Sequence, residues 1–240
     1  MRHPLARAVC AALKQAADPA KARPMQAYMK SAMPFRGVSG PEQKRMWRAL
    51  FSSRPLASFD EWQRVALELW RGAAFREERY AALGLTDLRR YAEYRTFAAI
   101  PMFEEMIVTG AWWDFVDAVA THQLQDVLRV DPRRMKPLMR RWAKSSDMWK
   151  RRAAILCQIR SKRETDLALL YACIEPNLAH RDFFIRKAIG WALREYSKTD
   201  GAAVAAFVEA NSSRLSPLTR REALLWLNGG RAGKAATRPR

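Results

Sequence analysis

One carboxylate among aromatic and basic side chains is the feature of this sequence that most directly suggests chemistry. Asp117 follows Trp113 by four residues, and Trp191 follows Lys187 by four. Residues four apart on a helix lie on the same face, about one turn from each other. If these segments are helices that lie side by side, two indoles and one carboxylate share a surface with cations.

A carboxylate in such a place can stabilise positive charge that forms during a reaction. Cleavage of an N-glycosidic bond gives the sugar oxocarbenium character, and a carboxylate beside C1′ stabilises that cation and orients a water for attack. Indole faces suit the same site, because they contact sugar C–H groups and attract cations. The competing interpretation is structural: Asp117 caps a helix or pairs with a neighbouring arginine. The residues alone leave both interpretations open.

An internal repeat indicates how the chain would position these residues. The segments that begin at Asp147, Asp182 and Pro217 start 35 residues apart, and each carries two adjacent cations before an apolar stretch of helical length. Helical units with such a period are typical of solenoids, because one helix pair cannot bury its apolar side alone. The sequence therefore predicts an all-α solenoid of stacked helix pairs.

The same register extends back to the segment that begins at Trp112. It aligns Asp117 with the second cation of each later segment, taken here as Arg152, Lys187 and Arg221. The repeat predicts that these four residues lie in a row across successive helices, with Asp117 replacing a cation. If the row lines the concave side, the protein has a basic groove with one carboxylate at its middle.

The charge balance indicates a polyanionic partner. The 240 residues include 43 Lys and Arg against 24 Asp and Glu, which gives a formal net charge of +19 spread along the chain. Such a field attracts phosphates, so nucleic acid is the leading candidate and an anionic membrane surface the second. The hydrophobic content of 49% is sufficient for a core and excludes a disordered tail.

Neither a metal site nor a membrane span is indicated. The three cysteines and three histidines lack the spacing of zinc ligands or of a disulfide framework, and we interpret the cysteines as buried structural thiols. No apolar run approaches the roughly 18 residues of a membrane span, and the N-terminus lacks a signal-peptide core. We therefore expect a cytoplasmic, nucleoid-associated monomer that uses no metal or cofactor.

Helical patterns extend along most of the chain. An amphipathic helix is predicted over residues 3–17 and a short one over 25–33, before a turn at 34–37. Further helices are predicted over 41–51, 58–70, 76–90, 96–109, 112–121, 124–129, 131–143, 147–159, 165–174, 182–196, 202–210 and 216–227. Residues 1–227 would form one repeat domain with N-terminal helices over 1–38, and residues 228–240 a basic disordered tail.

Four motifs, in order along the chain, resemble the AlkD-type DNA alkylation repair family. The first two are Tyr28-Met29-Lys30 before Pro34-Phe35-Arg36-Gly37, and Trp112-Trp113-Asp114-Phe115-Val116-Asp117. The others span residues 148–156 and 183–196, and the resemblance covers residues 25–228. The family consists of HEAT-like-repeat DNA glycosylases that excise N3- and N7-alkylated purines. The resemblance implies a right-handed α-solenoid of HEAT-like helix pairs with a basic concave face.

The resemblance also implies roles for single residues. Asp117 is the catalytic carboxylate, Trp113 and Trp191 hold the deoxyribose of the lesion, Arg152 contacts the DNA backbone, and Tyr28 lies near the DNA. We expect further DNA contacts from cations of the same segments, namely Lys30, Arg151, Arg186, Lys187 and Arg221. The partner would be double-stranded DNA with alkylated purines. The family works without a base-flipping pocket, and a cationic alkylpurine leaves as a neutral base without a general acid.

Three alternatives stay open. The first is a non-catalytic HEAT-like module that binds DNA or scaffolds another partner. The second is a solenoid whose groove holds an acidic peptide on Trp113 and Trp191. The third is a bifunctional lyase in which Lys187 forms a Schiff base with the abasic sugar; we favour phosphate contact for Lys187, because it shares its repeat position with Arg152 and Arg221.

Overall fold

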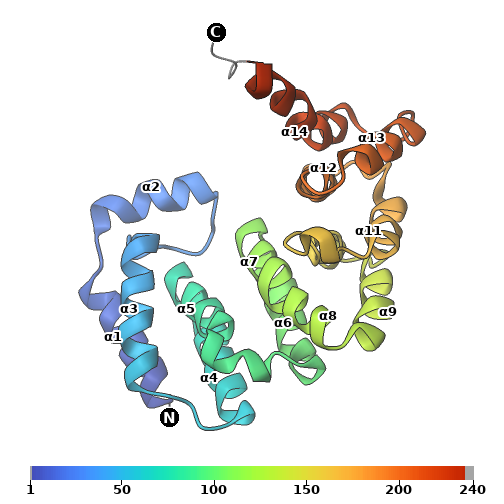
Figure 1. Ribbon diagram of the computed structural model, residues 1–240. Helices are drawn as coiled ribbons and strands as arrows, with labels where there is room; N and C mark the ends of the chain where they lie inside the picture. The colour runs from blue at the N-terminus through green and yellow to red at the C-terminus, as the bar shows by residue number, and fades with distance from the viewer. Residues whose placement is uncertain (1, 236–240) are drawn as a thin grey trace. The chain divides into compact units, whose positions relative to one another are not determined.

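The structure of the protein, a computed structural model, describes the backbone of residues 2–235. In this range all regular structure is helical and there is no strand (Figure 1). The all-α prediction is confirmed. The chain divides into two compact units, an N-terminal unit over Met1–Met102 and a C-terminal unit over Phe103–Arg240. The prediction of one repeat domain over residues 1–227 stays a prediction.

The N-terminal unit packs its first helix against three later ones. Its helices are α1 (Pro4–Gln15), α2 (Pro19–Met29), α3 (Gly40–Ser53), α4 (Phe59–Arg71) and α5 (Arg76–Asp87), followed by 3₁₀ turns at Arg89–Tyr94 and Phe97–Ala99. Helix α1 contacts α3, α4 and α5. Its apolar side chains recur at helical spacing, and Leu5, Val9 and Leu13 are fully buried. The amphipathic first helix is therefore part of the core, as predicted.

A buried carboxylate fixes the loop between α2 and α3. Glu77 on α5 is fully buried and accepts hydrogen bonds from the backbone N–H groups of Arg36, Gly37 and Val38 at 2.9–3.3 Å. Gly37 has a φ of +87°, and a Cβ there would lie 2.0 Å from the carbonyl oxygen of Asp18. The loop therefore requires glycine and is tied to α5 through its backbone.

The second helix begins earlier than predicted. Asp18 caps it with a side chain that accepts two backbone N–H bonds, and Pro19 occupies the first helical position, where its missing N–H costs nothing. Pro24 lies inside the helix, which ends one residue before Lys30, a residue with a left-handed φ of 48°. The predicted start at residue 25 was wrong, because the cap outweighs the one hydrogen bond that Pro24 removes.

The C-terminal unit alternates two sets of helices. After α6 (Ile100–Gly110) come α7 (Trp113–Ala118), α8 (Gln125–Val130), α9 (Pro132–Trp142), α10 (Met148–Leu156), α11 (Leu167–Ile174), α12 (Phe183–Ser197), α13 (Gly201–Ala210) and α14 (Pro217–Ala235). Short 3₁₀ turns at Lys162–Glu164 and Glu175–Asn177 flank α11. The predicted helix over 96–109 is a 3₁₀ turn followed by α6, which begins just before Pro101.

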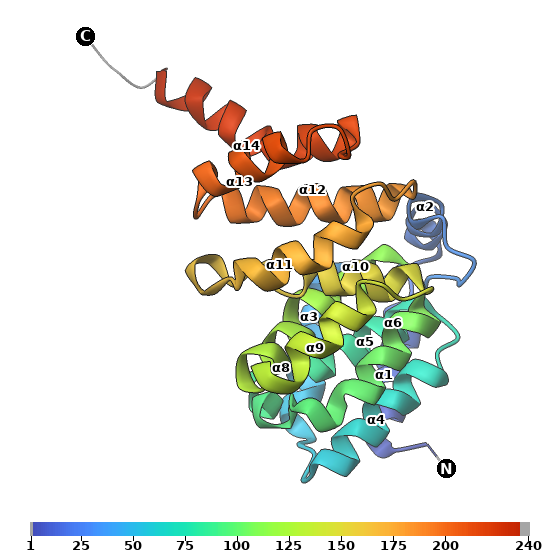
Figure 2. The ribbon, with the colours of Figure 1, turned by 90° about the vertical axis from the view of Figure 1, so that its right-hand side faces the viewer.

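Helices α7, α10, α12 and α14 form one layer of this unit, in which each contacts the next. They begin at 113, 148, 183 and 217, so the first two intervals equal the predicted repeat of 35 residues and the third is 34. Figure 2 shows α10, α12 and α14 stacked on one another. Asp147 and Asp182 cap α10 and α12 by accepting two backbone N–H bonds each, as predicted. This arrangement is consistent with an α-solenoid; its handedness and its basic concave face stay predictions.

The last helix extends beyond its predicted end at residue 227. Helix α14 continues to Ala235, so the first part of the predicted tail is helical. Residues 228–235 contain no proline, although three of the eight are glycines, which are weak helix formers. The rest of the predicted tail, residues 236–240, lies outside the described residues. Within the described part, no helix combines the length and the apolar character that crossing a lipid bilayer requires.

Candidate active site

Asp117 lies in the last turn of α7, directly before a π-helical segment, Val119–Leu124. Trp112 is the extended N-cap of α7, and the helix then continues without interruption through the π-helical segment into α8. The two separate helices predicted here are therefore one. π turns inside α-helices are rare and occur frequently at functional sites.

Asp117 forms a bidentate ion pair with Arg152 of α10. Nε and Nη2 of Arg152 donate to Oδ1 and Oδ2 of Asp117, each at 2.7 Å. The side chains of Arg152 and Asp117 are 6% and 14% exposed, respectively. Nη1 of Arg152 donates to the backbone carbonyl of Phe184 on α12. The arginine thereby connects three successive helices of the repeat layer, and its planar fork fixes both carboxylate oxygens.

Burial and the ion pair act on the carboxylate in opposite directions. Burial raises the pKa of Asp117 above its ordinary value of 3.8, and the hydrogen bonds from Arg152 oppose that rise. Asp114, one turn earlier, adds a smaller upward contribution to the same pKa. All three guanidinium nitrogens of Arg152 donate within the protein. The contacts of Asp117 are thus those of the structural interpretation, an ion pair with a neighbouring arginine. Contact between Arg152 and the DNA backbone stays a prediction.

The two tryptophans assigned to the site are half-buried. Trp113 opens α7 and lies one turn before Asp117 on the same helix, as the spacing predicted. Trp191 lies in the middle of α12, four residues after Lys187. Both side chains keep part of their surface open to solvent, so each can contact a partner. Their contacts with deoxyribose stay predictions.

An aromatic cluster supports the carbonyl group that anchors Arg152. The ring of Phe184 lies 5.5 Å from that of Trp112 and 5.3 Å from that of Trp149, measured between centroids. Phe183 packs edge-on against Phe184 at 5.5 Å and is half exposed. We did not predict a role for Phe184. The available signal was its repeat position, since Trp149 and Phe184 are 35 residues apart and both aromatic.

The charged row ends in a carboxylate at both ends. Asp117, Arg152, Lys187 and Glu222 are each separated by 35 residues, and the structure pairs the first with the second and the third with the fourth. Nζ of Lys187 donates to Oε1 of Glu222 at 2.9 Å. The other oxygen of Glu222 accepts from Nη1 of Arg194, also at 2.9 Å. The four residues therefore carry two negative and two positive charges. The expectation that every member except Asp117 is a cation was wrong.

The alignment of Arg221 with this row was wrong. It placed the basic pair of the last segment in register, whereas the ion pair with Lys187 puts Glu222 at the repeat position. Arg221 precedes the row by one residue, turned about 100° around α14, and is exposed. A contact between this exposed cation and DNA stays a prediction.

Two other cations predicted to contact DNA take part in the fold. Arg151 donates to the backbone carbonyl of Ser145 and, at 3.1 Å, to Oδ1 of Asn177. Nε of Arg186 donates to the backbone carbonyl of Asp182 at 3.4 Å. Both arginines are half-buried. They stabilise the starts of α10 and α12, and their contacts with DNA stay predictions.

Tyr28 and Lys30, in the N-terminal unit, lie at the end of α2. Tyr28 is 81% exposed, and Lys30 is the exposed C-cap residue. A tyrosine with so little packing contributes little to the fold and is available to a partner. Their role in DNA binding stays a prediction.

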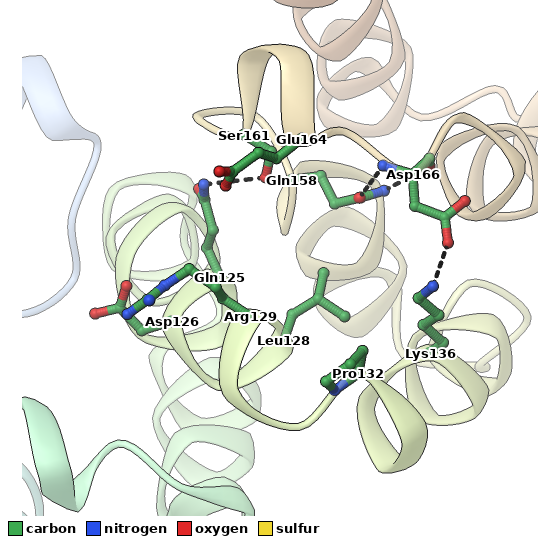
Figure 3. A pocket seen from close by; sticks show the side chains of 10 residues that line it. All are labelled: Gln125, Asp126, Leu128, Arg129, Pro132, Lys136, Gln158, Ser161, Glu164 and Asp166. Atoms are coloured by element: carbon green, nitrogen blue, oxygen red, sulfur yellow. Dashed lines mark hydrogen bonds and ion pairs between the residues drawn. The ribbon is translucent and has the colours of Figure 1, made fainter.

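A pocket lined by other residues lies between α8, α9 and the loop after α10 (Figure 3). Lys136 and Asp166 form an ion pair at 2.7 Å across it. Gln158 donates to the backbone carbonyl of Asp166 and accepts from its N–H, at 3.1 and 2.9 Å. Gln125 donates to Oγ of Ser161 at 3.1 Å. The pocket contains neither the carboxylate nor the tryptophans of the candidate site.

The thiols are poor candidates for chemistry. Cys157 and Cys173 are buried, and burial raises the pKa of Cys157 and raises that of Cys173 to about 12. Both stay protonated near neutral pH, and it is the thiolate that acts as nucleophile or metal ligand. Among the described residues, no group of three or more His, Cys, Asp or Glu is placed to hold a metal ion.

The chain is similar to one protein family over most of its length. The model of the DNA alkylation repair enzyme family matches residues 9–227. A solved structure, described as a predicted DNA alkylation repair enzyme from Enterococcus faecalis, superposes with a TM-score of 0.80 at 27% sequence identity. The match covers 88% of this chain and 96% of that chain. No curated protein matches the chain. The chain belongs to the DNA alkylation repair enzyme family.

Proposed function

We propose that the protein is a monofunctional DNA glycosylase, which hydrolyses the N-glycosidic bond of N3- or N7-alkylated purines in duplex DNA. The observation that carries this proposal is Asp117, a largely buried carboxylate held by two hydrogen bonds one turn from Trp113. Membership of a family of DNA alkylation repair enzymes and a net charge of +19 support DNA as the substrate.

The ion pair leaves the carboxylate able to act. A carboxylate has about four lone-pair sites, and Arg152 occupies one on each oxygen of Asp117. About two sites are left for a water or a substrate, and the side chain is 14% exposed. Arg152 also neutralises a charge that would otherwise repel the DNA backbone. We therefore assign Arg152 as the residue that positions Asp117.

The reaction then needs one carboxylate and one water. The bond between C1′ and the purine nitrogen breaks, and its electron pair neutralises the cationic base, which leaves without a general acid. Asp117 stabilises the oxocarbenium-like sugar and orients the water that attacks C1′. The water releases one proton to the solvent as the new C–O bond forms. Trp113 and Trp191 would hold the deoxyribose, and the base would stay largely stacked.

The proposed enzyme needs no metal or cofactor and acts as a monomer on DNA in the cytoplasm. Lys187 would contact phosphate and not form a Schiff base, since its amine is an ion-paired ammonium group in contact with Glu222 and a Schiff base requires a neutral amine. Borohydride trapping of a covalent protein–DNA adduct distinguishes the two, and we expect no adduct.

A non-catalytic DNA-binding module is the second candidate. The observation that favours it is the same ion pair, because a contact with Arg152 is a sufficient structural reason for a carboxylate at position 117. Under this alternative, the protein binds duplex DNA and releases no base.

The test is release of free base from DNA that carries N7-methylguanine or N3-methyladenine. We expect the wild-type protein to release base and Asp117→Asn to be slower by roughly 10² to 10³, the usual cost of one well-aimed electrostatic group, while it still binds duplex. The matched control is Asp126→Asn, which removes the same charge from α8 on the same continuous helix. Undiminished release by Asp117→Asn would contradict the assigned role, and no release by the wild type would favour the non-catalytic module.

A further inference from the structure

Glu222 connects two cations that flank a residue of the candidate site. Lys187, Trp191 and Arg194 are four and three residues apart on α12, so they form one stripe along the helix. Glu222 of α14 accepts from Nζ of Lys187 and from Nη1 of Arg194, both at 2.9 Å. One carboxylate therefore joins the cation one turn before Trp191 to the cation one turn after it.

The approach of α14 to α12 depends on Gly190, the residue before Trp191. A Cβ at this position would lie 2.5 Å from Cβ of Glu222 and 3.2 Å from the carbonyl oxygen of Thr219. Any other residue would push α14 away from α12. Thr219 is buried and donates its hydroxyl to the carbonyl of Arg186 at 3.3 Å. The α14 backbone is thus held against α12 at Thr219 and at Glu222 itself.

The three charged side chains differ in their exposure. Lys187 is 38% exposed and Arg194 25%, whereas Glu222 is 13% exposed. The cations therefore keep an open surface, while the carboxylate that holds them is covered. The hydrogen bond from Lys187 lowers the pKa of Glu222. Arg194 also lies 3.9 Å from Glu195, which pairs with Lys198, and these five side chains together carry one net positive charge at neutral pH.

Such an arrangement reduces the entropic cost of binding a phosphate. Lys and Arg side chains are among those that lose the most rotamer freedom when they are immobilised. Here Glu222 has already restricted both of them in the free protein. The disadvantage is repulsion between its carboxylate and the phosphate, which weakens overall binding. A residue of this kind improves geometry and lowers affinity.

We propose that Glu222 is a positioning residue, which holds Lys187 and Arg194 as a preformed pair of phosphate contacts on either side of Trp191. The inference adds Arg194 to the residues that contact DNA. It also gives Glu222 a role in DNA binding, although its negative charge repels phosphate. It rests on the proposed function, since Trp191 gains its importance from contact with the sugar of the lesion.

The test compares Glu222→Gln with the wild type in two measurements. On undamaged duplex, we expect tighter binding and a salt dependence of log K that is steeper by roughly 0.9, the value for one additional neutralised phosphate. On methylated DNA at saturating protein, we expect base release slower by about tenfold, because the cations are no longer fixed. The control, Glu209→Gln on α13, removes the same charge from an exposed position and should change neither value.

Each result separates one possibility. An unchanged salt dependence, or an unchanged release rate, overturns the proposal, and a lower melting temperature without a steeper salt dependence indicates only a packing role. In a Lys187→Gln background, Glu222→Gln should steepen the salt dependence less. If Glu222→Gln fails to fold, Lys187→Gln and Arg194→Gln should each flatten the slope by roughly 0.9. A wild type that releases no base would remove the glycosylase function, while the salt dependence would still test Glu222.

Discussion

Glu77 and Asp117 are both buried carboxylates, and they are held by different kinds of partner. Glu77, in the N-terminal unit, is fully buried and accepts hydrogen bonds from three consecutive backbone N–H groups. Asp117, in the C-terminal unit, is 14% exposed and accepts from the side chain of Arg152. Glu77 is therefore surrounded by the backbone donors of one loop, whereas a single side chain holds Asp117.

The two acids also differ in how much of each carboxylate a substrate could reach. Glu77 uses its oxygens to close the loop at Gly37 and has no surface at which a substrate could meet it. Asp117 is 14% exposed, accepts one hydrogen bond on each oxygen from Arg152, and lies one turn after Trp113 on the same helix. Burial alone would have selected Glu77 as the more unusual acid. The proposed catalytic role of Asp117 depends instead on its partial exposure and on its place next to Trp113.

The largest expected effect comes from removing the partner of Asp117. Arg152→Met leaves a buried carboxylate without a counter-charge, and we expect the free energy of unfolding to fall by about 3–5 kcal/mol. Urea denaturation measures this change. Adding Asp117→Asn to the same protein should restore part of the stability, because the unpaired charge is then gone. A loss below about 1 kcal/mol would mean that the pair contributes as little as a surface pair does.

Removing the charge of Glu77 should cost less and affect only the fold. In Glu77→Gln an amide NH₂ group must face backbone N–H donors, and we expect the free energy of unfolding to fall by about 2–3 kcal/mol. Base release per folded molecule should stay at the wild-type level. The control is Glu93→Gln, which changes an exposed side chain and should be neutral. A drop in base release for Glu77→Gln without unfolding would break the distinction between the two acids.

Protonation of Asp117 should have opposite effects on base release and on the stability of the fold. Burial raises its pKa above 3.8, so the folded protein takes up the proton at a higher pH than the unfolded chain does. As the pH falls through this raised pKa, base release should decrease, because the ionised form stabilises the sugar cation. Over the same range, protonation of Asp117 should favour the folded state. Single-turnover release and urea denaturation between pH 4 and 7 measure both; release that rises on acidification would contradict the role of the carboxylate.

The fold was predictable where local signals agree with one another. Asp147 and Asp182 cap helices at the predicted places, because an acidic N-cap and the apolar repeat that follows both indicate a helix start. The start of α2 was missed because two prolines competed, and the cap at Asp18 outweighed Pro24. The π-helical segment was not predictable, since Val119–Leu124 carries no glycine, proline or other residue that marks a change of helical pitch.

The candidate site was predictable in its members and not in their pairing. The repeat placed Asp117, Arg152 and Lys187 in one row, and the structure pairs Asp117 with Arg152 and Lys187 with Glu222. The repeat did not reveal that Arg152 is the partner of Asp117, because a period gives the order of residues and not their side-chain contacts. Glu222 was missed because the basic pair of the last segment was aligned in place of the strict 35-residue spacing. Two adjacent cations are a weaker guide to register than a constant interval.

The π-helical segment bears on how many residues this helix can contain between Asp117 and Leu128. A π turn holds one residue more than the α-helix needs, so deleting a single residue from Val119–Leu124 would restore ordinary pitch. The π turn absorbs this residue locally, so the half of the helix that carries Asp117 and the half that packs through Leu128 keep their faces. In a regular α-helix, the same extra residue would rotate Asp117 by about 100° relative to Leu128. The π turn thus lets the helix contain one residue more without turning the carboxylate away from Arg152.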